Sequence, residues 1–383
     1  MGQAAAERLP RRIALFANSD WYLFNFRRSL AEHLRAAGFE VILLSPDGPY
    51  GERLREAGFD WRAVPLRRTS LNPFAELAFV LWLARLFRRE RPDLVHGFTL
   101  KPVVYGAIAA RLAGVKARVS SVAGLGFVFI NPRPTARALR PLVRLMLQFA
   151  LAGGRSRLIL QNADDVALFE RQGLARPQHI RLIAGSGVDL ARFTPPARDD
   201  RAGPVLMVAR LLWDKGVAEF VEAARRLRGE GRNLRFAVAG DADPGNPAAV
   251  DAETLAQWKA EGVVDFLGHV EDAPALVRQA SMVVLPSYRE GLPKSLIEAA
   301  ACARPLITTD APGCRGVVTH QADGLLVPVR DAGALADAIA RLDDDPALAR
   351  RLGRAAREKA VREFDEAIVI ARTVAVYDEL LPP

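Results

Sequence analysis

Short apolar runs alternate along this chain with longer segments in which apolar residues recur at every third or fourth position. Such runs are typical of buried strands, and the periodic segments are typical of amphipathic helices. Because strands that alternate with helices form parallel sheets, the first half is predicted to be a doubly wound α/β domain. Its predicted strands lie at residues 12–18, 40–45, 61–64, 93–96, 117–121, 158–161 and 180–183.

The same alternation restarts after residues 195–204, a polar, proline-bearing segment that is typical of a linker. We therefore predict two Rossmann-like, doubly wound parallel-sheet domains that face a cleft, at residues 1–194 and 195–364. A helix at residues 365–383 is expected to pack back toward the first domain. The predicted strands of the second domain lie at residues 205–208, 234–239, 264–267, 282–285, 305–308 and 324–327.

The segment at residues 281–310 combines a strand, a loop and a helix in a way that predicts a binding site. Its apolar run is followed by Gly291, which frees the backbone, and by Pro293, which suits the first turn of a helix. A helix N-terminus then lies just past the carboxyl end of a parallel strand. Ligands bind at that place in open α/β sheets, and the unpaired amides favour an anion such as a diphosphate.

Charged residues of two kinds accompany this predicted site. Glu290 precedes the helix and Glu298 lies within it, and carboxylates accept hydrogen bonds from pairs of sugar hydroxyls. Arg210 and Lys215 follow the strand at 205–208, where two cations would neutralise a diphosphate and stabilise it as a leaving group. The alternative is ordinary surface charge, but the placement of all four residues at the ends of strands favours a site.

The whole-chain composition limits the class of protein. A chain of 383 residues with 50% hydrophobic and 25% charged residues is long enough for two globular domains. Cys302 and Cys314 are too few for a disulfide framework or a metal cluster, which favours a reducing compartment. Residues 1–12 lack the apolar core of a signal peptide, and charges interrupt the apolar stretches at 74–87 and 141–152. We therefore do not expect this chain to be an integral membrane protein.

Positive charge is concentrated in the first half, where residues 1–200 have a net charge of +13 and the remainder has −4. Within it, residues 94–163 contain ten basic residues and no acidic one. Near Phe127 and Phe129, a basic amphipathic helix predicts binding to an anionic membrane surface, and the alternative is a solvated charged face. The arginines that share one face of this helix are Arg133, Arg137, Arg140 and Arg144. Nucleic acid is not expected, because no helix-turn-helix, zinc-finger or stacking signature accompanies the charge.

The first strand-to-helix turn contains Asn18, Ser19 and Asp20 and lacks a G-x-G-x-x-G motif, which argues against a dinucleotide site there. These side chains still lie where a ligand would bind, and an acceptor or a phosphate is a possible partner. A plain helix N-cap formed by Ser19 or Asp20 is the alternative.

Several motifs in order resemble those of a known family. VARLLWDKG at 208–216 and EGLPKSLIEA at 290–299 resemble the donor site of the family 4 retaining glycosyltransferases, which have the two-domain GT-B fold. The resemblance covers essentially the whole chain. NSDWYLFNFR, VHGFTLKPVVYGAIAARLAG, VAGLGFVF and GSGVD are more narrowly similar to bacterial transferases of surface-polysaccharide and lipid-linked oligosaccharide assembly. Those enzymes use UDP-sugars, often UDP-N-acetylhexosamines, and act on undecaprenyl-diphosphate sugars.

The resemblance implies roles for individual residues. Arg210 and Lys215 would hold the donor diphosphate, and Glu290 would contact the donor sugar beside the amides of Gly291 and Leu292. Glu298 would bind the ribose hydroxyls. The other donor-side candidates, the first three of them near the base, are Gly268, His269, Val270 and Gly185. The acceptor-side or interdomain candidates are Ser19, Asp20 and Lys101.

The expected activity is a retaining transfer of a sugar, an N-acetylhexosamine, from a UDP-sugar to an undecaprenyl-diphosphate-linked sugar in bacterial glycan assembly. We expect no cofactor and no metal, because Asp241 and Asp243 mimic a metal-binding D-x-D but fall in a turn. The expected location is cytoplasmic, peripheral at the inner face of the plasma membrane. The alternatives are a nucleotide-sugar epimerase of the same architecture and a non-catalytic scaffold docked at the membrane.

This sequence departs from the family pattern at three places. Many members have a histidine after the fifth strand, and residues 121–124 contain none. Close relatives tend to have threonine where Ala123 stands and glutamate where Gly316 stands. All three departures concern the binding of sugars and leave the expected diphosphate site intact.

Overall fold

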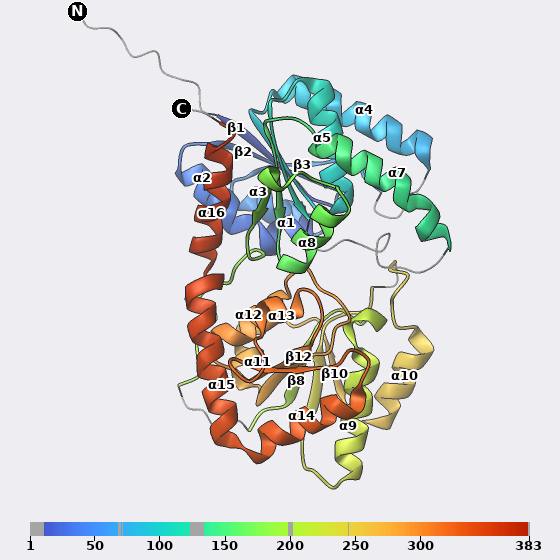
Figure 1. The fold of residues 1–383 in the computed structure, drawn as a ribbon, viewed down its shortest axis with the longest axis vertical. Coiled ribbons are helices and arrows are strands. Elements are labelled where there is room, and N and C mark those ends of the chain that lie inside the picture. Colours follow the sequence, from blue (N-terminus) through green and yellow to red (C-terminus); the bar gives the residue numbers. More distant parts are fainter. Residues whose placement is uncertain are drawn as a thin grey trace, which may run out of the picture. The chain divides into compact units, whose positions relative to one another are not determined.

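The computed structural model describes residues 11–67, 70, 72–122, 134–197, 202–243 and 245–381, with the backbone alone at 134–140 and 142. The chain forms two compact units, which Figure 1 shows as separate sheets with their helices. The first unit contains Met1–Leu160, Val166–Ile183 and Ile370–Pro383, and the second contains Gln161–Asp165 and Ala184–Val369.

The first unit is built on a seven-stranded parallel sheet of order β3-β2-β1-β4-β5-β6-β7. Every strand predicted for the first half is present, and the strand order reverses between β1 and β4, as in doubly wound folds. The strands are β1 (Arg12–Phe16), β2 (Glu40–Ser45), β3 (Asp60–Ala63), β4 (Leu94–Phe98), β5 (Ala117–Val122), β6 (Ser156–Leu160) and β7 (Ile180–Leu182).

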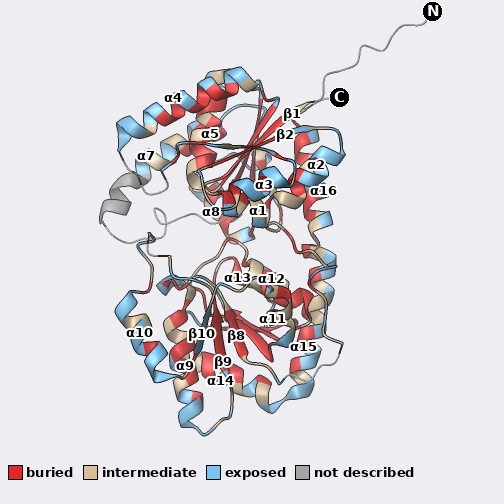
Figure 2. Cartoon of the chain, turned by 180° about the vertical axis from the view of Figure 1, so that it is seen from behind, coloured by how far each residue is buried: buried red, intermediate tan, exposed pale blue. Residues whose placement is uncertain are grey.

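The helices of this unit bury one side against the sheet, as Figure 2 shows by colour. They are α1 (Asp20–Phe26), α2 (Arg28–Ala36), α3 (Gly51–Glu56), α4 (Pro73–Glu90), α5 (Leu100–Ala113), α7 (Pro134–Leu151), α8 (Ala163–Arg171) and the short η1 (Pro177–His179). Among the described helices, none is long and apolar enough to cross a membrane.

The apolar periodicity of residues 21–38 predicts one amphipathic helix that ends at Gly38, and this prediction is wrong, because the structure divides the segment into α1 and α2 at Arg27. This residue leaves the helical dihedral angles, at φ −131° and ψ −2°. Its guanidinium turns inward, 4.4 Å from the centre of the Phe98 ring, and donates to the Tyr22 hydroxyl at 3.0 Å. An arginine drawn into the core thus ends a helix that the apolar periodicity alone would continue.

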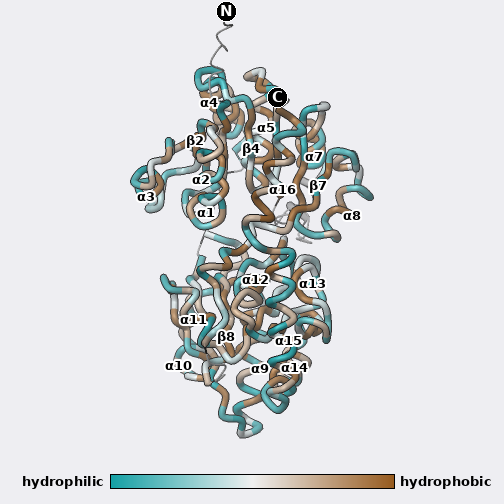
Figure 3. Tube along the Cα trace, turned by 90° about the vertical axis from the view of Figure 1, so that its left-hand side faces the viewer, coloured by the Kyte–Doolittle hydropathy of each residue, from teal (hydrophilic) through white to brown (hydrophobic). Residues whose placement is uncertain are grey.

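The second unit contains a six-stranded parallel sheet of order β10-β9-β8-β11-β12-β13, and all six predicted strands are present. The strands are β8 (Val205–Val208), β9 (Phe236–Ala239), β10 (Asp265–Gly268), β11 (Met282–Leu285), β12 (Leu306–Thr309) and β13 (Leu325–Val327). The helices are η2 (Trp213–Lys215), α9 (Val217–Gly229), α10 (Ala252–Glu261), α11 (Ala273–Gln279), α12 (Lys294–Ala301), α13 (Cys314–Val317), α14 (Ala332–Asp344), α15 (Pro346–Lys359) and η3 (Ala360–Phe364). The last helix, α16 (Glu366–Asp378), begins in this unit and belongs to the first unit from Ile370 onward. Most residues of the central strands of both sheets are buried, as expected for parallel sheets covered on both faces, and Figure 3 shows hydrophobic stretches in both units.

The units do not divide the chain at residue 194, where the prediction placed the boundary. Residues 184–194 belong to the second unit because Val188 and Phe193 lie in its core. The Val188 amide donates to the Phe364 carbonyl at 2.8 Å, and its carbonyl accepts from the Glu366 amide at 3.1 Å. From Ile370 onward the chain belongs to the first unit. That the two sheets face one cleft stays a prediction.

Candidate functional site

The loop that follows β11 brings two of the predicted residues into direct contact. Lys215 Nζ donates to Glu290 Oε1 at 2.5 Å, and the Ser287 hydroxyl lies 2.7 Å from the same oxygen. The Glu290 amide donates to the Pro312 carbonyl at 3.0 Å, which fixes the backbone that carries the carboxylate. A cation and a carboxylate from the loops after two neighbouring strands, β8 and β11, therefore form an ion pair at the carboxyl edge of the sheet.

Gly216 allows the turn that carries Lys215 to lie against the end of β11. Its φ is +76°, and a Cβ at this position would lie 2.2 Å from the Pro286 carbonyl oxygen. The Tyr288 amide donates to the Asp214 carbonyl at 2.9 Å and fastens the same two segments. Only glycine combines that dihedral angle with so close an approach.

Arg210, like Lys215, follows strand β8. Its Nη1 lies 2.6 Å from Asp243 Oδ2, while half of its side chain remains exposed. Asp214 is exposed overall, but desolvation of its carboxyl raises its pKa, Lys215 and Arg210 lower it, and Glu290 raises it further. The ion pair that the structure gives Arg210 is with Asp243, so its contact with a donor diphosphate stays a prediction.

The N-terminus of α12 follows the Glu290 loop directly. Pro293 occupies the N-cap position and makes no side-chain cap hydrogen bond, and the positive end of a helix dipole favours an anion. Leu292 packs near two glycines, since a Cβ built on Gly185 would lie 3.4 Å from Leu292 Cδ2, and one on Gly316 would lie 3.0 Å from Leu292 Cδ1. The departure at Gly316 is thus located beside the predicted donor loop.

Glu298 lies in α12, half-buried, and its ion pair within the described residues is with Lys294, whose Nζ is 3.9 Å away. Burial raises the pKa of Glu298, and Lys294 and Arg192 oppose this shift. The structure does not place this carboxylate in the Lys215–Glu290 contact. A separate contact with the ribose therefore stays a prediction.

The residues expected near the base lie at the end of β10. Gly268 has a φ of +66°, and its carbonyl accepts from the Gly240 amide at 2.8 Å. His269 Nδ1 lies 4.0 Å from Asp241 Oδ2, and Val270 packs against the core. They share the carboxyl edge of the sheet with the charged cluster, and one strand, β9, separates β10 from β8 in the sheet order.

The acceptor-side candidates in the first unit have structural partners. Ser19 caps α1, since its hydroxyl accepts from the Tyr22 amide at 3.2 Å. The buried carboxylate of Asp20 accepts from the Tyr50 and Gly51 amides at 2.6 and 3.0 Å, at the start of α3. Lys101 Nζ donates to Glu76 Oε1 at 2.9 Å and to the carbonyls of residues 67 and 70. Contacts between these residues and an acceptor stay predictions.

Of the four arginines predicted to face a membrane, the structure describes one side chain completely. Arg144 is exposed on α7. Arg137 and Arg140 lie in the same helix, but their side chains lie outside the described residues, as do the whole of Arg133 and Ala123.

Sequence reasoning missed a buried network that holds the Glu290 loop. Asn162 Nδ2 donates to the Gly291 carbonyl at 2.7 Å and to Asp165 Oδ2 at 3.0 Å, and Arg289 forms an ion pair with the other oxygen of Asp165. Burial raises the pKa of Asp165, against the opposing effects of Arg289 and Asn162. The spacing of Asn162 and Asp165 resembles a helix cap, and nothing in the sequence connects them with a loop 129 positions away.

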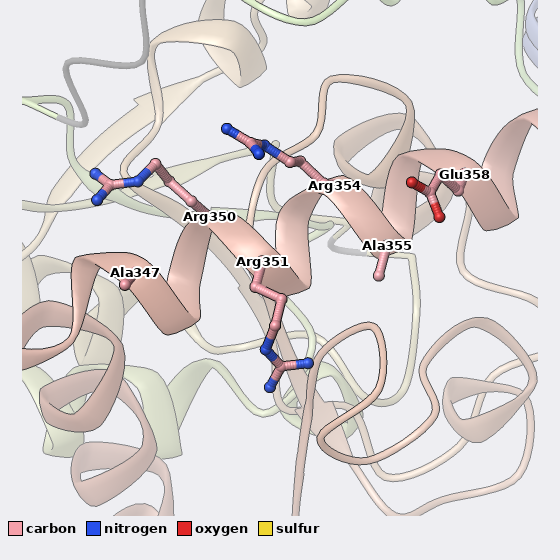
Figure 4. Close-up of a pocket in the computed structure, with 6 residues that line it drawn as sticks. All are labelled: Ala347, Arg350, Arg351, Arg354, Ala355 and Glu358. Atoms are coloured by element: carbon pink, nitrogen blue, oxygen red, sulfur yellow. The ribbon is translucent and has the colours of Figure 1, made fainter.

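Two further features of the second unit bear on binding. Within the described part of the chain, no group of three or more His, Cys, Asp or Glu side chains is placed to hold a metal ion. A shallow hollow lies on α15, and Figure 4 shows Arg350, Arg351 and Arg354 spreading from it in different directions. All of its lining residues come from α15, so it is separate from the cluster around Glu290.

Comparison with known proteins defines the class. The family described as "Glycosyl transferase 4-like" matches residues 12–162, and "Glycosyl transferases group 1" matches residues 203–345. EpsD, a putative glycosyltransferase of Bacillus subtilis, is 30% identical over 386 residues, which cover 96% of this chain and 97% of that protein. Fold and site therefore define a glycosyltransferase. The chain belongs to the family 4 glycosyltransferases, which have the GT-B fold, and the resemblance noted in the sequence is confirmed.

Other relatives extend the comparison. An N-acetylgalactosaminyltransferase of Campylobacter jejuni is 29% identical over 387 residues, covering 97% of this chain and 99% of that protein. Among solved structures, a sucrose-phosphate synthase from Thermosynechococcus elongatus has a TM-score of 0.78 at 21% identity, covering 97% of this chain and 99% of that one. HepE from Anabaena in complex with UDP has a TM-score of 0.75 at 18% identity, covering 96% and 100%. These structural similarities show the fold.

Proposed function

We propose that this glycosyltransferase moves a sugar from a UDP-sugar to an undecaprenyl-diphosphate-linked sugar, with retention of the anomeric configuration. The observation that carries the proposal is the Lys215–Glu290 contact of 2.5 Å beside the N-terminus of α12, which has no side-chain cap. A diphosphate needs cations and free amides in one place, and a sugar needs a fixed carboxylate beside them.

The printed names of two relatives support the choice of substrates. The Campylobacter jejuni protein is an N,N'-diacetylbacillosaminyl-diphospho-undecaprenol alpha-1,3-N-acetylgalactosaminyltransferase. A protein of Escherichia coli, 28% identical over 315 residues, is a UDP-Gal:alpha-D-GlcNAc-diphosphoundecaprenol alpha-1,3-galactosyltransferase. Both names combine a lipid diphosphate acceptor with an alpha linkage. We favour an N-acetylhexosamine as the donor sugar because the first of them covers nearly the whole chain.

The proposed mechanism is stabilisation of the leaving group. Arg210, Lys215 and the first amides of α12 bind the donor diphosphate and offset the negative charge that develops as the bond to the sugar breaks. Glu290 accepts hydrogen bonds from hydroxyls of the donor sugar, and the acceptor hydroxyl attacks from the face that the diphosphate leaves. We propose that cations of the protein take the place of a metal ion, and that the enzyme works at the cytoplasmic face of the membrane.

The test is turnover with a panel of UDP- and GDP-sugars and short polyprenyl-diphosphate sugars as acceptors, in the presence and absence of EDTA. The proposal predicts transfer from a UDP-sugar that EDTA leaves unchanged, with retained configuration in the product. Loss of turnover that Mn²⁺ restores would remove the metal-free mechanism. An epimer formed from a UDP-sugar alone, without transfer, would identify an epimerase instead.

Lys215→Ala is expected to lower the rate by on the order of 10²-fold or more, because it removes a cation that faces the departing diphosphate. The same loss is expected for Arg210→Ala. Arg350→Ala, on the separate hollow of α15, is the matched control and should keep the normal rate. Normal turnover in the Lys215 and Arg210 variants would end the assignment of this site.

A further inference from the structure

The outer side of α4 is apolar although it faces solvent. Phe74, Leu77, Leu81 and Trp82 are 83%, 58%, 42% and 37% exposed, respectively. Their spacing places them along one side of the helix, whose other side is buried, and Figure 2 shows this exposed outer side. We call these four residues the α4 apolar surface. A helix that is apolar on both sides requires a second apolar environment.

No free charge interrupts the α4 apolar surface. Between residues 73 and 84, the only charged residue is Glu76. Its carboxylate is mostly buried and accepts from Lys101 Nζ at 2.9 Å, so the pair is neutral as a whole. Large exposed apolar patches on soluble proteins mark contacts with proteins or membranes.

Neighbouring helices extend the exposed apolar area. In Figure 1, α4, α5 and α7 lie along the same part of the first unit, and α5 contacts both of the others. Leu112 at the end of α5 is 46% exposed, and Leu145 and Phe149 on α7 are 64% and 47% exposed. The Arg111 guanidinium lies 4.2 Å from the centre of the Phe149 ring, which joins α5 to α7. Exposed apolar side chains therefore stand on all three helices.

Positive charge surrounds this area. Residues 100–122 and 134–151 contain no aspartate or glutamate. Exposed arginines stand on all three helices: Arg85 and Arg88 on α4, Arg111 on α5 and Arg144 on α7. Such a rim attracts the phosphates of anionic lipids, and it would repel the same rim on a second copy of the chain.

We propose that the α4 apolar surface inserts into the interfacial layer of an anionic phospholipid bilayer, with the surrounding arginines at the headgroup phosphates. The aromatic side chains Phe74 and Trp82 suit the boundary between acyl chains and headgroups. The inference deepens the proposed function, on which it rests for its purpose: an enzyme docked in this way meets an acceptor that is anchored in the same bilayer. It assigns the insertion to α4 rather than to the arginine face of α7 alone.

The experiment is cosedimentation of the full chain with vesicles of phosphatidylglycerol and phosphatidylethanolamine, and with vesicles of phosphatidylcholine alone. The native chain is expected to bind the anionic vesicles more strongly. Phe74→Ser with Leu77→Ser should weaken that binding by about tenfold or more. The matched control, Leu182→Ser with Val361→Ser, changes two exposed apolar residues elsewhere and should bind normally. Circular dichroism checks that both variants fold.

Vesicle binding and catalysis are measured separately. The α4 variant should keep normal turnover with a water-soluble, short-chain acceptor, so loss of vesicle binding with turnover intact supports insertion by α4. If the native chain binds vesicles through α4 but transfers no sugar, the result would support the docking surface and reject the proposed activity. Undiminished binding by the variant would overturn the inference. So would a dimer of the native chain that the variant abolishes, without vesicle binding, because the occupant would then be a second copy.

Discussion

Lys215 and Glu290 neutralise each other at 2.5 Å, so a diphosphate must draw the ammonium away from an existing partner. Both residues, like Arg210, were predictable because they stand at the ends of apolar strands, where ligands bind in parallel sheets. Asn162, Asp165 and Arg289 were not predictable. Their roles depend on contacts between segments 124 and 129 positions apart, which no local pattern records.

Asp165→Asn tests whether the buried network positions the Glu290 loop. It leaves Arg289 without its carboxylate, and removing one partner of a buried ion pair costs about 3 kcal/mol. We expect that loss in denaturant unfolding, together with a higher KM for the donor. Asp164→Asn is the control, because the adjacent Asp164 forms an exposed pair with Arg315 and should cost at most about 1 kcal/mol. Equal effects of the two substitutions would contradict a positioning role.

Glu298→Gln tests the environment of the carboxyl in α12. Because burial raises the pKa of Glu298, the folded protein holds its proton at pH values where the unfolded chain has released it. Stability is therefore lost as pH rises above the ordinary glutamate pKa of about 4.3. The glutamine variant should be nearly as stable as the native chain at low pH and gain relative stability toward neutral pH. A difference in Tm that does not change with pH would reject the raised pKa.

Among the elements, the turn after β8 has little freedom, because Gly216 lies against the Pro286 carbonyl. The sequence predicts that this turn lies between a strand and a helix, but it does not predict the contact of the turn with the end of β11. The division of α1 from α2 is similar: periodicity predicts one helix, and the inward side chain of Arg27 ends it. Periodicity detects which side of an element is apolar and misses a polar residue that the core accepts.

Gly216→Ala should destabilise the second unit by roughly 2 kcal/mol or more. Alanine would have to adopt the left-handed backbone conformation, and its Cβ would clash with the Pro286 carbonyl. Turnover should fall with it, because Lys215 is the preceding residue. Gly229→Ala is the matched control, since a Cβ there meets nothing within 4 Å. Thermal unfolding and kcat/KM measure both effects. Unchanged stability in the Gly216 variant would show that the turn can move away from β11.

At the scale of the whole molecule, both sheets were predictable because most of their strands are short, local apolar runs. Their strand orders were not, because the pairing of β1 with β4 or of β8 with β11 depends on contacts across long stretches of chain. The division into units also depends on contacts between distant stretches of the chain. Tyr377 belongs to the first unit, where its buried hydroxyl lies 2.6 Å from His96 Nδ1.

Removal of residues 370–383 should therefore destabilise the first unit and spare the second. It uncovers His96 and takes Glu379 from Arg157 and Arg181, which it contacts at 2.7 and 2.6 Å. Hydrogen exchange should show faster exchange in β4 and β6, with protection of β8 and β11 preserved. Uniform loss of protection in both sheets would contradict independent units.

The composition of the first unit from three separate stretches has a consequence for biosynthesis. A ribosome releases residues 184–369, nearly all of the second unit, before it supplies Tyr377 to the first. The sheet of the first unit, which is synthesised earlier, therefore keeps His96 uncovered while the sheet of the second unit folds. Chaperones that shelter nascent polypeptides should accordingly remain on the early half until Tyr377 has left the ribosome.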